Sequence, residues 1–399
     1  MNKLSLKEMD VAGKRVLMRV DFNVPVKEGV VGDDTRIVAA LPSINHVLEQ
    51  GGSLVLVSHC GRPKGEKNME YTLKPAADRL AELVDAKVTL APDVMGDEVD
   101  ALVKALEPGQ ILVLENVRFY KEEEGKGCTP EEQQAFAKQL AAYGEVYVSD
   151  AFGTAHRAHA SMAVVTDYID LCGAGFLLEK EIAYLGKALE APEHPFVAII
   201  GGAKISGKID VVENLMDKCD TILIGGGMAY TFYTAKGLAI GDSLLEADKV
   251  ELAGEILKKA EAKGVELLLP VDHVVADSFS ADANVKEIEG EIEAGWMALD
   301  IGPKTAALYS EAVSKAKTVV WNGPMGCFEM APFASGTNAV CEAVAASDSV
   351  SIIGGGDSVA AVKSAGVADQ MSHVSTGGGA SLEFMEGKQL PGIVALSDA

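Results

Sequence analysis

The stretch Ser349-Val350-Ser351-Ile352-Ile353-Gly354-Gly355-Gly356-Asp357-Ser358 decides the fold, because a short apolar run passes through a glycine turn into the start of a helix. Residues 349–353 are too few for a helix and predict a buried strand. A glycine turn at the end of a strand lets backbone N–H groups approach a phosphate. The order of strand, glycine turn and helix is typical of α/β proteins with parallel sheets.

Similar short apolar runs recur along the chain. They predict strands at residues 14–20, 53–57, 110–114, 145–148, 196–200, 221–224, 266–269, 318–321 and 349–353. Periodic segments between them predict helices at residues 35–50, 72–84, 97–106, 130–143, 249–263 and 303–315. Strands of continuous apolar character separated by helices indicate parallel sheets that are covered on both faces. We therefore expect an α/β fold of two Rossmann-like lobes, each a mostly parallel sheet with helices on both faces.

The length of the chain also predicts two domains, because 399 residues exceed what one ordinary core supports. Residues 175–190 form one amphipathic pattern that predicts a helix, and the stretch 191–195 that ends it contains Pro192 and Pro195. We expect an N-terminal lobe at residues 1–174, a connecting hinge helix at 175–192 and a C-terminal lobe at 193–387.

The composition excludes several classes of protein. The net charge of −24 disfavours binding to nucleic acid and to anionic membranes. The six cysteines form no CxxC pair, so the sequence predicts neither a disulfide framework nor a zinc site. There is no apolar run of 18 residues and no signal-like N-terminus. We expect a soluble, cytoplasmic protein.

The arginines and the glycine runs occupy different halves of the chain. Arginine is suited to binding carboxylate and phosphate with a planar fork. The two halves are therefore expected to bind anions by different devices, which suggests a group transfer between two anionic partners. The seven arginines all lie within residues 1–157, and the triple-glycine runs all lie after residue 200.

Polar residues in the first half follow the predicted strands at their carboxyl ends, where open parallel sheets bind ligands. They are Asp21, Asn23, His59, Arg62, Arg118, His156, Arg157 and His159. Arg36 opens the first long helix, where a cation opposes the helix dipole unless an anion lies between them. Arg36 could instead simply pair with Asp33 or Asp34. The implied ligand is small, at least dianionic, and carries a hydroxyl group.

The second half contains an incomplete phosphate-binding motif. Residues 202–209 nearly match the P-loop pattern GxxxxGK[ST], but Ile209 stands where a hydroxyl would help to hold Mg²⁺. Asp357 could supply that metal ligand, or it could be a plain N-cap. Lys204 and Lys208 lie four residues apart, so they would share a face if this segment is helical.

A further loop, residues 321–329, gives a weaker indication, since Asn322 and Glu329 could contact a ribose or a base. No GxGxxG motif follows the first strand of the second half, and kinase signatures such as HRD and DFG are absent. A Rossmann dinucleotide site and a protein kinase are therefore not supported.

Several spaced motifs together closely resemble phosphoglycerate kinase, in the order of that family and over essentially the whole chain. One small departure is Cys60, which replaces a bulkier apolar residue beside His59, and we expect it to be sensitive to oxidation. The motifs are Val20-Asp21-Phe22-Asn23-Val24-Pro25, Ser58-His59-Cys60-Gly61-Arg62-Pro63, Glu115-Asn116-Val117-Arg118-Phe119 and the segments 152–159, 201–204, 321–329, 354–357 and 375–381.

The resemblance implies that the N-terminal lobe binds 3-phosphoglycerate or 1,3-bisphosphoglycerate and that the C-terminal lobe binds ADP or ATP with Mg²⁺. It also implies that residues 388–399 return to the N-terminal lobe. The implied glycerate-binding residues are Asp21, Asn23, Arg36, His59, Arg62, Arg118 and Arg157. The implied nucleotide-binding residues are Gly202, Ala203, Lys204, Lys208, Gly226, Asn322, Pro324, Glu329, Gly355, Gly356, Asp357 and Ser358, with Asp357 as the metal ligand.

The implied reaction is an in-line phosphoryl transfer in a hinge-closed, cation-lined cleft. An acceptor carboxylate is already ionised at pH 7, so no general base is needed, and positioning and charge neutralisation remain. We assign the charge neutralisation to Arg36, Lys204 and the turns at Gly354 and Gly377. A kinase for another carboxylate and a non-enzymatic, hinged anion-binding protein are the alternatives. We expect a monomer whose partners are small molecules.

Overall fold

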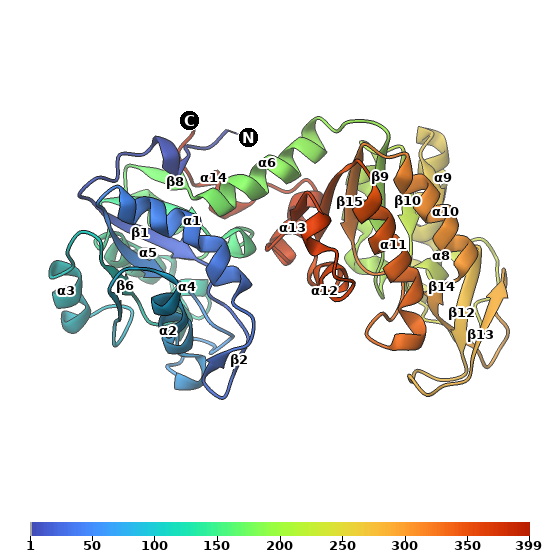
Figure 1. The fold of residues 1–399 in the computed structure, drawn as a ribbon, viewed down its shortest axis with the longest axis horizontal. Helices are drawn as coiled ribbons and strands as arrows, with labels where there is room; N and C mark the ends of the chain where they lie inside the picture. Colours follow the sequence, from blue (N-terminus) through green and yellow to red (C-terminus); the bar gives the residue numbers. More distant parts are fainter. Residues whose placement is uncertain (1) are drawn as a thin grey trace. The chain divides into compact units, whose positions relative to one another are not determined.

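The computed structural model describes residues 2–399, which form two compact units. One unit comprises the residues up to Ala183 together with Gln389–Ala399, and the other is Tyr184–Lys388. The change from the first unit to the second falls inside helix α6 (Phe176–Glu190), which is labelled in Figure 1. Within residues 2–399, no helix combines the length and the apolar character needed to cross a bilayer.

The first unit is built on a six-stranded sheet of parallel strands in the order β5-β6-β4-β1-β7-β8. All residues of β4, β6 and β7 are buried, so the sheet is covered on both faces, as their continuous apolar sequences predict. The strands are β1 (Arg15–Val20), β4 (Ser53–Val57), β5 (Val88–Leu90), β6 (Ile111–Val113), β7 (Val146–Asp150) and β8 (Cys172–Ala174). The main helices are α1 (Thr35–Glu49), α2 (Lys74–Leu83), α3 (Asp97–Lys104) and α5 (Pro130–Ala141).

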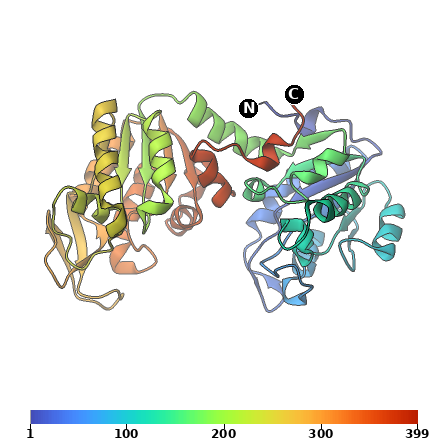
Figure 2. The same cartoon turned by 180° about the vertical axis from the view of Figure 1, so that it is seen from behind.

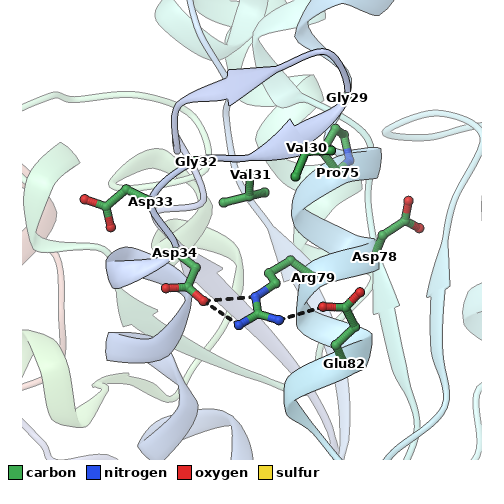
Figure 3. Close-up of a pocket in the computed structure, with 10 residues that line it drawn as sticks. All are labelled: Gly29, Val30, Val31, Gly32, Asp33, Asp34, Pro75, Asp78, Arg79 and Glu82. Atoms are coloured by element: carbon green, nitrogen blue, oxygen red, sulfur yellow. Dashed lines mark hydrogen bonds and ion pairs between the residues drawn. The ribbon is translucent and has the colours of Figure 1, made fainter.

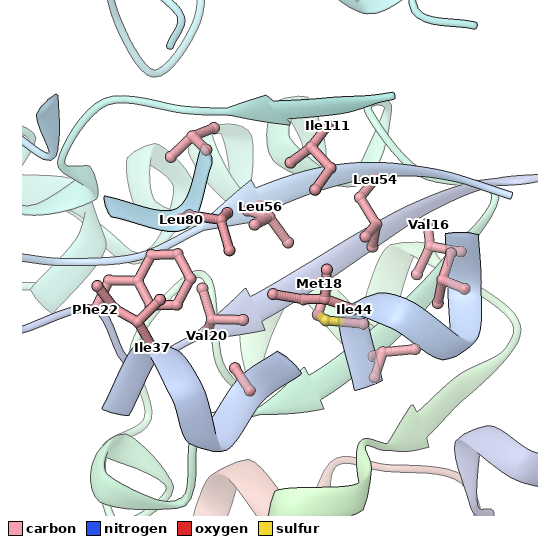
Figure 4. Packing of buried hydrophobic residues seen from close by; sticks show 14 of the residues in the cluster. Val16, Met18, Val20, Phe22, Ile37, Ile44, Leu54, Leu56, Leu80 and Ile111 are labelled. Atoms are coloured by element: carbon pink, nitrogen blue, oxygen red, sulfur yellow. The ribbon is translucent and has the colours of Figure 1, made fainter. Parts of the chain in front are cut away.

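One face of this sheet carries a continuous apolar core, shown in Figure 4. Met18 and Val20 of β1 lie on the same face because side chains two apart along a strand point the same way. Ile44 of α1 and Leu80 of α2 pack against them. Each such buried side chain contributes roughly 1.5–3 kcal/mol, so this layer fixes the positions of the loops at the strand ends.

The second unit contains a six-stranded parallel sheet and a separate three-stranded antiparallel sheet. The parallel order is β11-β10-β9-β15-β16-β17 and the antiparallel order is β13-β12-β14. The expected α/β fold with mostly parallel sheets is confirmed, although no strand was predicted between residues 270 and 302. The strands are β9 (Phe196–Ile200), β10 (Thr221–Ile224), β11 (Glu266–Leu268), β12 (Asp272–Ala276), β13 (Val285–Glu289), β14 (Met297–Ile301), β15 (Thr318–Asn322), β16 (Val350–Gly354) and β17 (His373–Val374).

Helices of this unit follow its strands. They are α7 (Ile209–Met216), α8 (Ala229–Ala235), α9 (Val250–Lys263), α10 (Pro303–Ser314), α11 (Ser335–Ala346), α12 (Gly356–Ser364) and α13 (Gly379–Met385). Periodic segments of the sequence predict two of them, α9 and α10. The short helix α14 (Pro391–Val394) belongs to the first unit.

The end of the chain packs beside its beginning within the first unit. The backbone N–H of Leu4 donates to Ser397 O at 2.9 Å, and Lys3 Nζ lies 2.7 Å from Asp398 Oδ1. Gly392 N–H also donates to Ala155 O at 2.8 Å. Figure 2 shows the two labelled ends side by side, so the unit is completed by residues from both ends of the sequence.

Helix α6 begins on a buried carboxylate at the end of β7. Asp150 Oδ1 accepts from the backbone N–H groups of Leu177 and Leu178 at 2.9 and 3.2 Å. Burial raises the pKa of Asp150 to about 7, against the opposing hydrogen bonds. A Cβ atom on Gly175 would lie 2.3 Å from Asp150 Oδ1, so this start of the helix requires glycine.

Candidate active site

The loop after β1 holds Arg36 in the first unit. Arg36 Nη1 donates to the carbonyl oxygen of Asn23 at 2.8 Å and lies 3.4 Å from Asp21 Oδ2. Asn23 Oδ1 in turn accepts from Gly61 N–H at 2.9 Å, which ties the loop after β1 to the loop after β4. Asp21 therefore helps to hold Arg36 in place.

The alternative pairing of Arg36 with Asp34 is wrong, because Asp34 binds a different arginine. Arg79 on α2 donates to Asp34 Oδ2 from Nε at 2.9 Å and from Nη2 at 2.8 Å. Its Nη1 donates to Glu82 Oε2 at 2.6 Å, as Figure 3 shows. These groups line a surface hollow between α2 and the hairpin strand β3 (Val30–Val31).

His59 follows β4 and is held by a buried arginine that the sequence reasoning did not select. Arg19 lies on β1, is 0% exposed, and places Nη2 at 3.2 Å from His59 Nδ1. Burial, followed by the charges of Arg19 and Arg118, holds the pKa of His59 well below its ordinary value. Since Arg19 is a donor only, Nδ1 of the neutral ring is the acceptor and the proton resides on Nε2.

The buried carboxylate of Glu123 is linked to Arg19 through Ser161. Arg19 Nε donates to Ser161 Oγ at 2.8 Å, and Ser161 donates to Glu123 from Oγ at 2.7 Å and from N–H at 2.9 Å. Glu123 is 0% exposed, and its burial raises its pKa. The only local signal for this network is an arginine inside the apolar strand β1.

The remaining predicted residues of this half differ in burial. Arg118 donates from Nη1 to Gly61 O at 2.9 Å, and its burial lowers its pKa. His159 is buried, and burial followed by nearby arginine charges lowers its pKa to about 3. Arg62 and Arg157 are exposed. Hydrogen bonds and one ion pair thus link Asp21, Asn23, Arg36 and Arg118 through the loops after three neighbouring strands, and Nδ1 of the neutral His59 lies 3.9 Å from Asp21 Oδ1.

Cys60 lies in the same loop as His59 and is buried. Burial, followed by the charges of Glu115 and Asp21, raises the pKa of its thiol. A raised pKa disfavours the thiolate, which is the form that reacts with peroxide.

Glycine turns in the second unit approach one another more closely than any side chain would allow. A Cβ atom on Gly201 would lie 2.1 Å from Pro324 O, and one on Gly323 would lie 2.1 Å from Gly201 O. Backbone hydrogen bonds join the turns, including Gly202 N–H to Pro324 O at 3.1 Å and Gly226 N–H to Met325 O at 2.9 Å. The result is a cradle of backbone at the carboxyl ends of β9, β10 and β15.

Lys204 and Lys208 flank a 3-10 turn, η6 (Ile205–Gly207), so the α-helical conformation in which they would share one face is not present. Lys204 is exposed, whereas Lys208 points inward and donates to Asn322 Oδ1. Burial lowers the pKa of Lys208 to about 8, against the opposing charges of Asp357 and Glu386.

Asn322 presents an unused donor beside the glycine turn of β16. It is 1% exposed, and its Nδ2 has no hydrogen-bond partner among residues 2–399. A Cβ atom on Gly355 would lie 3.0 Å from that nitrogen. A buried amide donor next to a glycine turn and a half-buried lysine is an arrangement suited to an anion.

Asp357 is not the N-cap of α12, because Gly355 occupies that position with φ +88°. Asp357 is the second residue of the helix and is exposed. The next residue, Ser358, is buried and its Oγ accepts from Gly323 N–H at 2.6 Å. Ser358 therefore stabilises the Gly323 turn, whereas Asp357 is exposed and lines the neighbouring hollow.

The donor set around Asp357 fits Mg²⁺ that is brought in with phosphate. Within residues 2–399, no three or more histidine, cysteine, aspartate or glutamate side chains gather in a way that could hold a metal ion. Mg²⁺ commonly takes one or two carboxylates together with phosphate oxygens and water. A single exposed carboxylate beside a backbone cradle meets that requirement.

An apolar hollow of about 520 Å³ lies next to the cradle. Its walls come from seven separate segments, which sequence reasoning did not assemble. It has the size of a site for a small planar ligand such as a base. The residues that line it include Gly202, Ala203, Gly226, Gly227, Tyr230, Leu244, Phe279, Met297, Leu299, Pro324, Cys327, Glu329 and Asp357.

The turn at Gly377 is already engaged internally. Its N–H donates to Ser375 Oγ at 3.0 Å, and Gly378 adopts φ +50° ahead of α13. Gly354 is the last residue of β16 and is buried. The backbone N–H groups that have no partner within helix α12 belong to its first residues, which come after Gly354.

His273 is buried in contact with Tyr230, and we expect it to make the stability of the protein depend on pH. It is 0% exposed, with Nδ1 at 3.1 Å from Tyr230 OH and Nε2 at 3.1 Å from Tyr233 OH. Burial lowers the pKa of His273 to about 4, so the unfolded chain binds a proton that the folded chain excludes. We expect the free energy of unfolding to fall by on the order of 3 kcal/mol from this group between pH 6.5 and 4.

The measurement is urea unfolding of the parent chain and His273→Asn at pH 7.5 and pH 4.5. The two chains should differ less in stability at the lower pH. Burial raises the pKa of Asp300 to about 7, so its contribution to stability changes with pH in the opposite direction. Comparing the two chains cancels this contribution because both contain Asp300. An identical difference at both pH values would contradict a neutral, buried His273.

Comparison with known proteins agrees with the site geometry. Residues 6–388 match the family model described as phosphoglycerate kinase. The chain is 58% identical to a phosphoglycerate kinase of Chloroherpeton thalassium and 56% identical to one of Acidobacterium capsulatum, each over the full length of both chains. The solved phosphoglycerate kinase of Coxiella burnetii is 43% identical, with a TM-score of 0.89 and 98% of each chain covered. The chain therefore belongs to the phosphoglycerate kinase family.

Proposed function

We propose that Arg36, Lys204 and Asp357 are central to the activity of this chain, which is the reversible transfer of a phosphoryl group between 1,3-bisphosphoglycerate and ADP. The products are 3-phosphoglycerate and ATP, so the enzyme is a phosphotransferase of glycolysis. The observation that supports the assignment most strongly is the fixed position of Arg36, between Asn23 O and Asp21. An arginine held at a strand end by two acceptors is preorganised to bind an anion.

The first unit is proposed to hold the glycerate substrate. Its cations offset the negative charge of the phosphate and carboxylate, and Asp21 accepts a hydrogen bond from the substrate hydroxyl. Neutral His59 contributes an Nε2–H donor, because Arg19 occupies its Nδ1. The proposed binding set is Asp21, Asn23, Arg36, His59, Arg62, Arg118 and Arg157.

The second unit is proposed to hold the nucleotide. The base would occupy the apolar hollow, and the phosphates would lie against the glycine cradle and the lysines. Mg²⁺, held by Asp357 and the phosphates, would neutralise charge on the nucleotide. The proposed set is Gly202, Ala203, Lys204, Lys208, Gly226, Asn322, Pro324, Glu329, Gly355, Gly356, Asp357 and Ser358.

The chemistry requires positioning and charge neutralisation more than proton transfer. In the direction of ATP consumption, a carboxylate oxygen of 3-phosphoglycerate attacks the γ-phosphorus in line and ADP leaves. The attacking carboxylate is ionised at neutral pH, so no side chain has to remove a proton. Arg36, Lys204 and the turns at Gly354 and Gly377 are proposed to neutralise the transferring group. Because the substrates are assigned to different units, turnover would require a closure that excludes water.

The lobe assignment predicts the effect of Arg62→Ala. Loss of one exposed guanidinium should raise the KM for 3-phosphoglycerate by about tenfold, since 1.4 kcal/mol corresponds to a factor of ten. The KM for Mg-ATP should not change. Steady-state kinetics with each substrate varied would measure both values, and Arg79→Ala is a matched arginine control outside the proposed set. An increase in the KM for Mg-ATP alone would reverse the assignment of the two substrates to the two units.

The test of the activity itself is ADP release from Mg-ATP with and without 3-phosphoglycerate, with hydroxylamine present to trap an acyl phosphate. Release that depends on 3-phosphoglycerate, with hydroxamate formed, is the expected result. A panel of other carboxylates would identify a different carboxylate kinase. Binding of both ligands without release would favour the non-enzymatic alternative.

We also propose that the protein works as a cytoplasmic monomer with small-molecule partners. The net charge of −24 and the six free cysteines support this proposal. Analytical ultracentrifugation at micromolar concentration should give a mass near 41.8 kDa. A concentration-dependent mass of twice that value would contradict the monomer.

A further inference from the structure

The turn that bears both lysines is held by a residue from a distant segment. Lys204 occupies the N-cap position of η6, but its side chain makes no capping hydrogen bond. Glu246 supplies the acceptors instead. Its Oε2 accepts from Ser206 N–H at 3.0 Å, and its Oε1 accepts from Ser206 Oγ at 2.5 Å. Both carboxylate oxygens are thus used by one residue of the turn.

Glu246 is itself fixed next to a segment that lines the nucleotide hollow. Its N–H donates to Thr231 Oγ1 at 3.3 Å, and Thr231 is 1% exposed on α8. Helix α8 begins just after the glycine turn at residues 225–227, and Leu244, two residues before Glu246, lines the hollow. The lysine turn and the hollow are therefore connected through Glu246.

The charge of Glu246 is maintained by its surroundings. Burial acts to raise its pKa, but hydrogen bonds from Ser206 and Ile205 and the charge of Lys204 outweigh burial, so the pKa is lowered. A carboxylate near a polyanionic ligand would normally disfavour binding. Here two donors occupy its oxygens, which makes the position consistent with a role in holding the turn.

We propose that Glu246 is the positioning residue for Lys204, an inference that rests on the proposed role of Lys204 in phosphoryl transfer. Lysine has a flexible four-carbon stem, so its ammonium group is directed only if the backbone that bears it is fixed. Ile205 anchors one side of the turn in the core, and Glu246 anchors the other. Displacement of a charge-stabilising group by about 1 Å can cost up to about 10²-fold in rate.

The experiment measures kcat and both KM values for Glu246→Ala, Glu246→Asp and Glu246→Gln. We expect Glu246→Ala to lower kcat by about 10- to 100-fold and to leave the KM for 3-phosphoglycerate unchanged. Glu246→Asp keeps the charge but is one methylene shorter, so it should also lower kcat. Glu246→Gln keeps a carbonyl acceptor at full length and should recover most of the activity. Glu251→Ala, an exposed glutamate on α9, is the control.

A double-mutant cycle with Lys204→Ala separates positioning from general damage. Once Lys204 is absent, Glu246→Ala should reduce kcat little further. Independent, multiplying losses would overturn the inference, as would a Glu246→Ala enzyme within twofold of the parent. Full recovery by Glu246→Asp but not by Glu246→Gln would also overturn it. That result would show that the negative charge of residue 246 matters and that its hydrogen bonds to Ser206 do not.

The failure of this inference can be told apart from that of the proposed function. Full activity of Lys204→Ala would overturn both the role of Lys204 and the role of Glu246. Full activity of Glu246→Ala together with an impaired Lys204→Ala would overturn the inference alone. Absence of turnover in the parent chain would reject the proposed function itself.

Discussion

Replacing Arg36 with alanine is expected to lower kcat by on the order of 10³-fold or more, because the transferring phosphoryl group loses a preorganised positive charge. The guanidinium is held by Asn23 O at 2.8 Å and by Asp21 at 3.4 Å, so little reorganisation is needed when negative charge develops. The KM for Mg-ATP should stay within about twofold if the nucleotide is held by the other unit alone. Single-turnover kinetics would measure the chemical step directly.

Two controls make the Arg36 result specific. Arg36→Lys keeps the charge but not the planar fork, so it should recover only part of the rate. Arg79→Ala removes a similarly exposed arginine that binds Asp34 and Glu82, and it should leave kcat unchanged. A loss below tenfold in Arg36→Ala would remove this residue from the catalytic role.

The Gly323→Ala substitution is expected to destabilise the second unit by roughly 3–5 kcal/mol, from backbone strain and overpacking together. Gly323 has φ +97°, and a Cβ atom there would lie 2.1 Å from Gly201 O and 2.4 Å from Gly201 C. Backbone cannot move aside as a flexible side chain would. The two turns should therefore separate, and ATP affinity should fall sharply. Urea unfolding and calorimetric titration with Mg-ATP would measure the two effects.

Gly237→Ala is the matched control for this prediction. Gly237 also has a positive φ, +78°, but its Cβ atom would meet nothing within 4 Å. Its cost should be limited to about 1 kcal/mol of conformational strain, with no loss of ATP affinity. Equal effects of the two substitutions would show that the close approach of the turns is unimportant.

Nine of the twelve strands in the two parallel sheets could be predicted to within two residues, because their apolar runs reflect burial on both faces, whereas β5, β8 and β17, each only two or three residues long, were missed. The strand expected at residues 14–20 is β1 (Arg15–Val20), and the one expected at 349–353 is β16 (Val350–Gly354). The antiparallel strand β13 (Val285–Glu289) was missed because three of its five residues are charged and alternate ones are exposed. A half-exposed polar strand resembles a loop when only its composition is considered.

The candidate site was predictable where one short segment holds several of its residues, as around Asp21 and Asn23. It was not predictable where the contact joins distant segments. Arg19 meets Ser161 142 residues away, and Glu246 meets Ser206 40 residues away. Nothing in the local sequence of either residue identifies its partner. The conformation between Lys204 and Lys208 was also missed, because spacing alone does not distinguish a 3-10 turn from an α-helix.

The joined ends of the chain have a consequence for the order of folding during synthesis. Ser397 and Asp398 pair with residues 3 and 4, and Gly392 with Ala155. On the ribosome the first unit therefore emerges early yet lacks residues 389–399 until all of the second unit has been synthesised. The part of the enzyme that is made first would be finished last. A chain truncated after Lys388 and released from the ribosome should contain a folded second unit and a protease-sensitive first unit.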